Sequence, residues 1–175
     1  MSATATHMRR EIEEIPQATA RLLDGSAKVL ADAGRGLRER DPHFVVTVAR
    51  ASDYAIDILA GPERSVAATK TFVNSAVAAL ALMAHSTGDE ALLAALARLP
   101  EHFEKAIAYD WMALAAALET PRSLFILGRG PSFAIASEAA LKFKETCAMH
   151  AEAYSAAEVM HGPLALVGPG FPVLA

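Results

Sequence analysis

A glycine-rich turn, Gly128-Arg-Gly-Pro-Ser132, is the first feature of this sequence that could do chemistry. It follows a short apolar run and precedes a helical pattern, and backbone N–H groups at a helix start favour an anion such as phosphate. Arg129 could add a charge-assisted contact to that anion. The turn lacks the lysine of a P-loop and the third glycine of a dinucleotide-binding motif, so ATP and NAD are weak interpretations. By spacing alone, phosphate binding and a purely structural tight turn explain it equally well.

Titratable side chains are concentrated after this turn. Glu145 ends the following helical pattern, and His150, Glu152, Glu158 and His161 come soon after it. A carboxylate and a histidine that converge on one pocket can move protons at a sugar carbonyl and its neighbouring carbon. Glu158 and His161 lie one helical turn apart, which leaves a metal site open, although their spacing matches no recognised metal motif. We expect neither a metal nor a cofactor, and by spacing alone most of these acidic residues fit surface charges.

Several segments of the chain resemble the sugar isomerase (SIS) family. The most specific is the block from Gly128 to His161, with Leu-Lys-Phe-Lys-Glu at 141–145 and His-Ala-Glu-Ala-Tyr at 150–154. It runs on through His-Gly-Pro-Leu-Ala-Leu at 161–166, and segments 8–16 and 61–72 agree as well. Within the family, the similarity is to the isomerase module of glutamine–fructose-6-phosphate aminotransferases, and it extends over most of the chain.

This resemblance implies tandem α/β domains that bind a phosphorylated sugar between them, usually in a homodimer. Glu145 matches the carboxylate that shuttles a proton between C1 and C2 in a ketose–aldose interconversion. His161 matches a histidine that is associated with ring opening and comes from the neighbouring subunit. The residues expected at the site are Glu145 and His161 as catalytic groups, and Val66, Ala67, Gly128, Arg129, Gly130 and Ser132 as substrate-binding groups.

The sequence also departs from the family pattern. A serine-rich loop and a Ser-Gln-Ser-Gly loop that grips the sugar phosphate are missing near residues 50–51, and the family continues beyond Ala175 to a lysine that forms a Schiff base. No glutaminase domain precedes the matching segments. We therefore expect an isomerase, deaminase or aminotransferase relative with little or no catalysis. The alternatives are a non-catalytic phosphosugar-binding or dimerisation module, and a sequence that joins pieces of a longer protein.

The hydrophobic patterns predict a helix-rich α/β fold, a three-layer arrangement of a parallel sheet with flanking helices. The patterns give helices at 8–23 (interrupted at Pro16), 26–37, 65–84 (capped by Ser65), 90–99, 101–118 and 133–146, and strands or extended segments at 43–49, 54–59, 123–127, 151–154 and 171–175. Too few residues separate the first two strands for a parallel crossover, so we expect either an antiparallel hairpin that turns at 50–53 or a chain from which a crossover is missing. We expect two incomplete tandem domains, at 1–99 and 100–175.

Composition excludes several classes of protein. The 175 residues are 53% hydrophobic, with 39 alanines and 11 aromatic residues, which favours packed helices over a disordered chain or a β-sandwich. The net charge of −4, without a strongly basic stretch, argues against a nucleic-acid partner. The uncharged segment 71–88 is alanine-rich and carries polar residues, so we expect no membrane span. The lone Cys147 and the polar N-terminal segment indicate a cytoplasmic protein.

Overall fold

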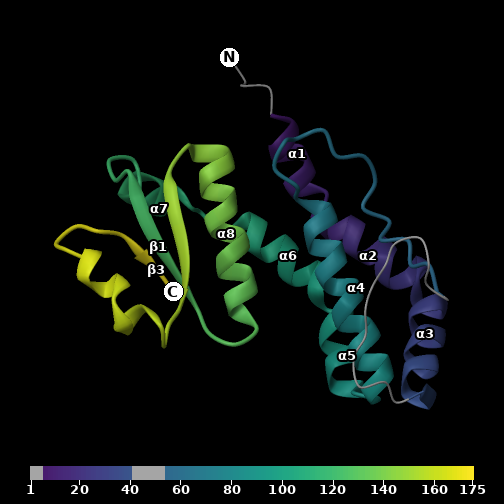
Figure 1. The fold of residues 1–175 in the computed structure, drawn as a ribbon. Coiled ribbons are helices and arrows are strands. Elements are labelled where there is room, and N and C mark those ends of the chain that lie inside the picture. The colour runs from purple at the N-terminus through teal and green to yellow at the C-terminus, as the bar shows by residue number, and fades with distance from the viewer. Residues whose placement is uncertain (1–5, 41–53) are drawn as a thin grey trace. The chain divides into compact units, whose positions relative to one another are not determined.

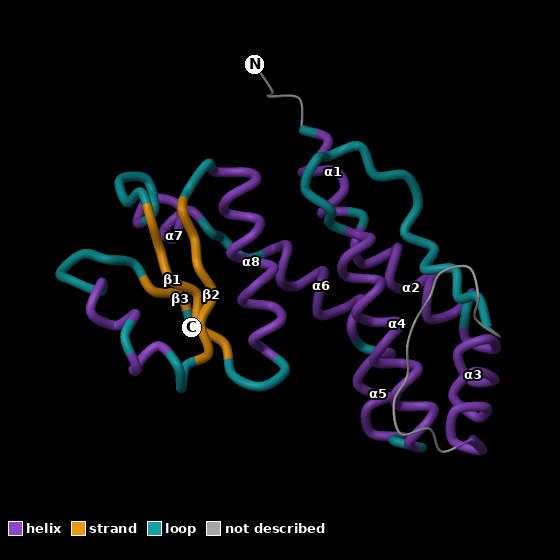
Figure 2. Tube along the Cα trace, viewed as in Figure 1, coloured by secondary structure: helices purple, strands orange, loops and turns teal. Residues whose placement is uncertain are grey.

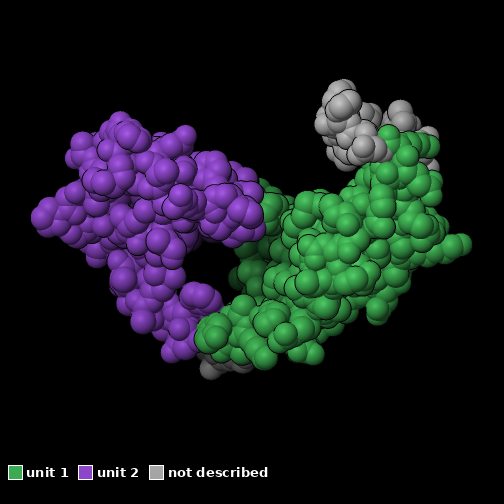
Figure 3. All heavy atoms as spheres, turned by 90° about the horizontal axis from the view of Figure 1, so that it is seen from below, with its two compact units in different colours: residues 1–109 green, residues 110–175 purple. Residues whose placement is uncertain are grey.

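The computed structural model describes residues 6–40 and 54–175. The contacts divide the chain into two compact units, residues 1–109 and 110–175, which Figure 3 shows in different colours. The boundary expected from the sequence, at 99/100, falls in the first turn of helix α6 (Leu99–Ala108), and this helix packs on α2 (Ile15–Gly25) within the first unit. That the two units correspond to two incomplete tandem SIS domains stays a prediction.

The first unit is built from helices (Figure 1). With α2 and α6 it contains α1 (His7–Glu13), α3 (Ala27–Arg40), α4 (Lys70–Thr87) and α5 (Glu90–Ala97). The predicted interruption at Pro16 is confirmed, because α1 ends at Glu13 and Pro16 lies in the first turn of α2, where a missing N–H costs nothing. Leucine, valine and alanine side chains of α2, α3, α4 and α5 form the core.

Helix α3 extends to Arg40, beyond the end predicted at residue 37. Its glycines do not end the helix but allow close packing against a neighbouring helix. A Cβ on Gly34 would lie 2.3 Å from Cβ of His85, so the absence of a side chain lets α3 and α4 approach closely. Beyond Gly34, Arg38 Nε donates a hydrogen bond to the Ser86 carbonyl (2.7 Å) at the end of α4. The two helices therefore remain in contact to the last turn of α3.

The predicted strand at 54–59 is wrong, because the segment forms no sheet hydrogen bonds and runs extended along the helices. Side chains satisfy its carbonyl groups instead. The Ser26 hydroxyl donates to the Asp57 carbonyl (2.7 Å), and the Asn74 amide donates to the Ile58 carbonyl (2.7 Å). The predicted strand at 43–49 and the expected deletion near 50–51 lie outside the described residues.

The second unit contains a parallel βαβ arrangement, with strands in orange in Figure 2. Its elements are α7 (Met112–Ala117), β1 (Ser123–Gly128), α8 (Ser132–Cys147), β2 (His150–Ser155), the 3-10 helices η1 (Val159–His161) and η2 (Pro163–Leu166), and β3 (Val173–Leu174). The strand order is β2-β1-β3, and both pairings are parallel. The α/β fold class is confirmed, whereas the single helix predicted at 101–118 is wrong, because α6 ends at Ala108 and α7 starts at Met112.

The two faces of this sheet are covered differently. Leu124 and Ile126 of β1 pack with Ala136 and Ala140 of α8 in the core of the unit. On the other face, the ring of Phe125 makes edge-to-face contacts with the rings of Tyr154 and Phe171, at centroid distances of 4.9 and 4.8 Å. Alternation along β1 thus places helix α8 against one face and an aromatic cluster against the other.

Candidate functional site

The glycine turn joins the carboxyl end of β1 to the first turn of α8. A Cβ on Gly128 would lie 2.6 Å from the Ser132 carbonyl oxygen, and Gly130 has a positive φ of 57°. The Ser132 hydroxyl accepts from the Arg129 N–H (2.8 Å) and donates to the Arg129 carbonyl (3.0 Å). Both glycines and the serine are therefore required by the turn itself, whether or not an anion binds there. The Arg129 side chain is exposed and forms no ion pair with any described residue.

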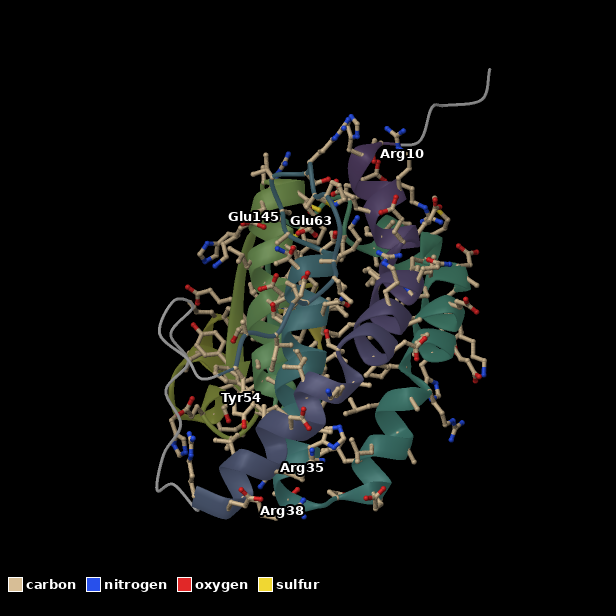
Figure 4. The ribbon with its side chains drawn as sticks, turned by 90° about the vertical axis from the view of Figure 1, so that its right-hand side faces the viewer. Arg10, Arg35, Arg38, Tyr54, Glu63 and Glu145 are labelled. Atoms are coloured by element: carbon tan, nitrogen blue, oxygen red, sulfur yellow. The ribbon has the colours of Figure 1, made fainter. Side chains whose placement is uncertain are left out.

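Glu145 lies in the last turn of α8 (Figure 4), and Lys142 precedes it by one turn of the same helix. Lys142 Nζ is 3.1 Å from Glu145 Oε2 and 2.8 Å from Glu138 Oε1. Desolvation lowers the pKa of Lys142, but its hydrogen bonds to Glu138 and Glu145 outweigh this effect and raise the pKa above the ordinary value. Lys142 is therefore a permanent cation at neutral pH, and Oε1 of Glu145 accepts no hydrogen bond from the described part of the chain.

His161 lies beyond the carboxyl end of β2, at the same edge of the sheet as the glycine turn. The Ala156 N–H donates to the Gly128 carbonyl (2.9 Å), which holds the two loops together, and His161 is exposed at the end of η1. Helix α8 runs from this edge to the opposite edge, and the 14 residues from Ser132 to Glu145 span about 20 Å. One chain therefore places Glu145 far from the glycine turn and from the segment that carries His161.

Val66 and Ala67 lie in the first unit, in the loop that precedes α4. Val66 is 97% exposed and Ala67 is 1% exposed, so this loop turns one side chain outward and the next into the protein. The loop has no regular secondary structure, yet side chains bind its backbone. Glu11 of α1 accepts hydrogen bonds from the Arg64 N–H (2.5 Å) and the Ser65 N–H (3.3 Å). The predicted N-cap at Ser65 is wrong, because that amide is bound by Glu11 and α4 starts only at Lys70.

Glu63 binds the start of α4 in place of a capping serine (Figure 4). Its carboxylate accepts hydrogen bonds from the Thr69 N–H (2.6 Å), the Thr69 hydroxyl (2.8 Å), the Thr71 N–H (3.3 Å) and the Thr71 hydroxyl. Desolvation raises the pKa of Glu63, but the hydrogen bonds from Thr71 and Thr69 outweigh it and lower the pKa to about 2. The Ser65 hydroxyl and the Arg64 and Ser65 N–H groups likewise hold the pKa of Glu11 below its ordinary value.

An ion pair between a buried lysine and a half-exposed carboxylate also holds this loop. Lys70 is 1% exposed, and its Nζ lies 2.5 Å from Glu14 Oε2 and 2.9 Å from the Pro62 carbonyl oxygen. Sequence reasoning missed Glu11, Glu14, Glu63 and Lys70, because their partners are not close in a helical or strand repeat. The available signal was that segments 8–16 and 61–72 both resemble one family, and the structure shows that these segments bind each other.

Other features of the described residues are weaker. A pocket of about 440 Å³ in the second unit is lined mainly by apolar side chains. Glu119, Arg122 and Cys147 also line it. Among the titratable side chains after the glycine turn, His150 and Glu152 are 3.6 Å apart, but within 6–40 and 54–175 no three His, Cys, Asp or Glu side chains gather around one point. No helix in these ranges is long and apolar enough to cross a membrane.

Comparison with known proteins shows which family has this sequence and fold. A family model described as "SIS domain" matches residues 117–175. A crystal structure from Silicibacter pomeroyi DSS-3, described as a phosphosugar isomerase, is 39% identical, with a TM-score of 0.89, over 97% of this chain and 77% of that one. The chain belongs to the SIS family. The C-terminal domain of glucosamine-fructose-6-phosphate aminotransferase from Francisella tularensis shares the fold, with 21% identity and a TM-score of 0.69 over 98% of this chain and 75% of that one.

Curated relatives are longer proteins. The SIS chain is 36% identical over 188 residues to a glutamine–fructose-6-phosphate aminotransferase (isomerizing) of Rhizobium meliloti, an alignment that includes 94% of this chain and 31% of that protein. An enzyme of the same name from Gluconobacter oxydans is 42% identical over 140 residues, or 74% of this chain and 23% of the enzyme. The chain thus spans about a third or less of the length of these relatives.

Proposed function

We propose that this SIS protein binds a hexose phosphate and that Glu145 transfers a proton between two adjacent carbons of the sugar, as in a ketose–aldose interconversion. The supporting observation is the state of the Glu145 carboxylate. Lys142 holds Oε2, while Oε1 accepts no hydrogen bond within the described ranges. A carboxylate fixed through one oxygen can present the other to a substrate C–H group, which is what general base catalysis requires.

The chemistry needs only groups that can move protons. Glu145 would remove a proton from the hydroxyl-bearing carbon next to the carbonyl, and the electron pair would form a C=C bond while the negative charge moves to the former carbonyl oxygen. The proton of the neighbouring hydroxyl group would move to that oxygen, and Glu145 would return its own proton to the former carbonyl carbon. The Lys142 ammonium would stabilise the carboxylate and the negative charge that develops on the enediol oxygen. His161 would assist ring opening, as the resemblance implies. We propose no metal or cofactor, since the interconversion is an internal transfer of hydrogen.

A homodimer is part of this proposal. Glu145 lies at the C-terminal end of α8, whereas His161 lies at the edge of the sheet where α8 begins. A site that uses both residues therefore needs two chains. A mixture of Glu145→Gln and His161→Asn variants tests the arrangement. In a dimer that pairs Glu145 of one chain with the His161 of the other, half of the randomly formed dimers would be mixed, and each would regain one intact site, giving about a quarter of the wild-type rate. No recovery from the mixture would contradict the shared site.

A non-catalytic phosphosugar-binding module is the second candidate. The observation in its favour is that the exposed glycine turn and Glu145 are about 20 Å apart in one chain, so binding at the turn would not bring a sugar to the carboxylate. In either case we place the protein in the cytoplasm, where its single thiol at Cys147 would stay reduced, and we propose no nucleic-acid partner.

Calorimetry with fructose 6-phosphate and glucosamine 6-phosphate, followed by NMR detection of interconversion, tests both candidates. Binding with turnover that is lost in Glu145→Gln and kept in the matched surface variant Glu119→Gln supports the enzyme. Saturable binding without turnover, weakened by Gly130→Asp, supports the binding module. Absence of binding by the wild-type protein to every hexose phosphate would contradict both.

A further inference from the structure

The loop from Gly61 to Thr69 is held in place to an unusual degree for a segment without secondary structure. Such loops are commonly mobile, because water satisfies their backbone groups. Here Glu11 binds the N–H groups of Arg64 and Ser65, and Lys70 binds the Pro62 carbonyl. Between these anchors the loop carries Val66, whose side chain is 97% exposed. The backbone of the loop is therefore fixed, although the side chain of Val66 contacts almost nothing.

Glu63 makes the strongest of these attachments. It accepts two backbone N–H groups and two hydroxyl groups at the first turn of α4, where the helix dipole favours a negative charge. The carboxylate lies near the start of the loop, and its partners are the N-cap residue Thr69 and Thr71 in the first turn of α4. Glu63 therefore sets the distance between the loop and the helix, and the intervening residues, including Val66, have little freedom to move.

Lys70 breaks two rules of helix design. It is a cation in the first turn of α4, where the dipole disfavours positive charge, and it is 1% exposed, so it loses its hydration. The Glu14 carboxylate (2.5 Å) offsets part of this cost, yet an apolar side chain of similar size would avoid it altogether. Residues that violate local rules without a gain in stability are often kept for function. What Lys70 adds is the hydrogen bond to the Pro62 carbonyl at the start of the loop.

We propose that Glu63 and Lys70 are positioning residues that hold the backbone at Val66 and Ala67 in the conformation that contacts the sugar. This inference rests on the proposed function and on the resemblance to the SIS family, which implies that Val66 and Ala67 contact the sugar. Neither Glu63 nor Lys70 would touch the substrate. Their effect would be to remove the cost of ordering the loop when the ligand binds, and such ordering costs reduce affinity directly.

The test compares Glu63→Gln and Lys70→Met with the matched control Glu13→Gln, which removes an exposed carboxylate of α1 that pairs with Arg9. Amide hydrogen exchange at residues 66–68, the melting temperature and the dissociation constant for fructose 6-phosphate are measured for each protein. We expect exchange at 66–68 to accelerate and the dissociation constant to rise about tenfold in both test variants, with the control unchanged. Lys70→Met keeps the volume of the side chain, so it remains informative where Glu63→Gln folds poorly.

The outcomes separate a positioning role from a structural one. A structural role alone would lower the melting temperature and leave the affinity measured well below that temperature unchanged, and this result would overturn the inference. Wild-type exchange rates at 66–68 in both variants would overturn it as well. A wild-type protein that binds no hexose phosphate would instead refute the proposed function, and with it the ligand assigned to this loop.

Discussion

Replacing Glu63 by glutamine should make the stability of the first unit less dependent on pH. The ordinary carboxyl pKa of 4.5 is lowered to about 2 in the folded chain, because hydrogen bonds from Thr71 and Thr69 outweigh the opposing effect of desolvation. A fully shielded group with this shift would contribute about 3.4 kcal/mol to the free energy of unfolding at pH 7. Because Glu63 is partly exposed, we expect about 1 to 2 kcal/mol.

The sign of the pH dependence follows from the lowered pKa. A group that ionises more readily in the folded state stabilises it above the unfolded pKa, near pH 4.5, and this contribution is lost as the pH falls towards 2. Urea denaturation followed by far-ultraviolet circular dichroism at pH 7, 5 and 3 measures it. The difference between wild type and Glu63→Gln should be constant from pH 7 to 5 and smaller at pH 3. Equal stability of Glu63→Gln and Glu13→Gln at pH 7, or a difference that does not shrink at pH 3, would refute the reasoning.

Three further substitutions test the packing by urea denaturation. Asn74→Ala should lower the free energy of unfolding by about 2 to 4 kcal/mol, because it leaves two carbonyl groups of the first unit without their donor. Gly34→Ala should cost about 1 to 3 kcal/mol, since the new Cβ would lie 2.3 Å from Cβ of His85. Gly128→Ala should cost a similar amount, because its Cβ would lie 2.6 Å from a backbone oxygen of α8, whereas Gly168→Ala, with nothing within 4 Å, should be neutral.

Local signals in the sequence predicted the elements that depend on local chemistry. Pro16 marks a helix boundary because it lacks an N–H, and the apolar run 123–127 followed by glycines gives a strand that enters a turn. The extent of α8 was also predicted to within one residue at each end. In each case the deciding interaction is made by the residue itself or by a neighbour within one turn.

The predictions that failed depend on partners far away in the sequence. Ser65 has the chemistry of an N-cap, but Glu11, more than 50 residues earlier, binds its amide and the helix starts later. The pattern at 54–59 is that of a strand, but Ser26 and Asn74 provide the hydrogen bonds that a neighbouring strand would give. Propensity cannot identify such partners, because it describes a segment without its surroundings.

Sequence proximity was also a poor guide to which residues of the candidate site lie together in the structure. Glu145 and His161 are close in sequence, which suggested one pocket, yet α8 and β2 separate them across the sheet. In a βαβ unit the helix runs back to the amino ends of the strands, and the second strand takes the chain again to their carboxyl ends. Residues at the end of the helix and residues after the second strand therefore lie at opposite edges, whatever their separation in sequence.

The two lysine clusters of this chain illustrate how a structural ion pair differs from one that leaves a group free to react. Lys70 is buried and binds the Glu14 carboxylate and the Pro62 carbonyl, so its position is fixed. Lys142 lies between two carboxylates, 2.8 Å from Glu138 and 3.1 Å from Glu145. Its bond to Glu145 uses one carboxylate oxygen, and the other accepts no hydrogen bond from the described residues. The pair on α8 therefore fits the proposed role of Glu145 as a group that acts on a ligand, and the pair on α4 fits the proposed role of Lys70 as a group that holds the protein in place.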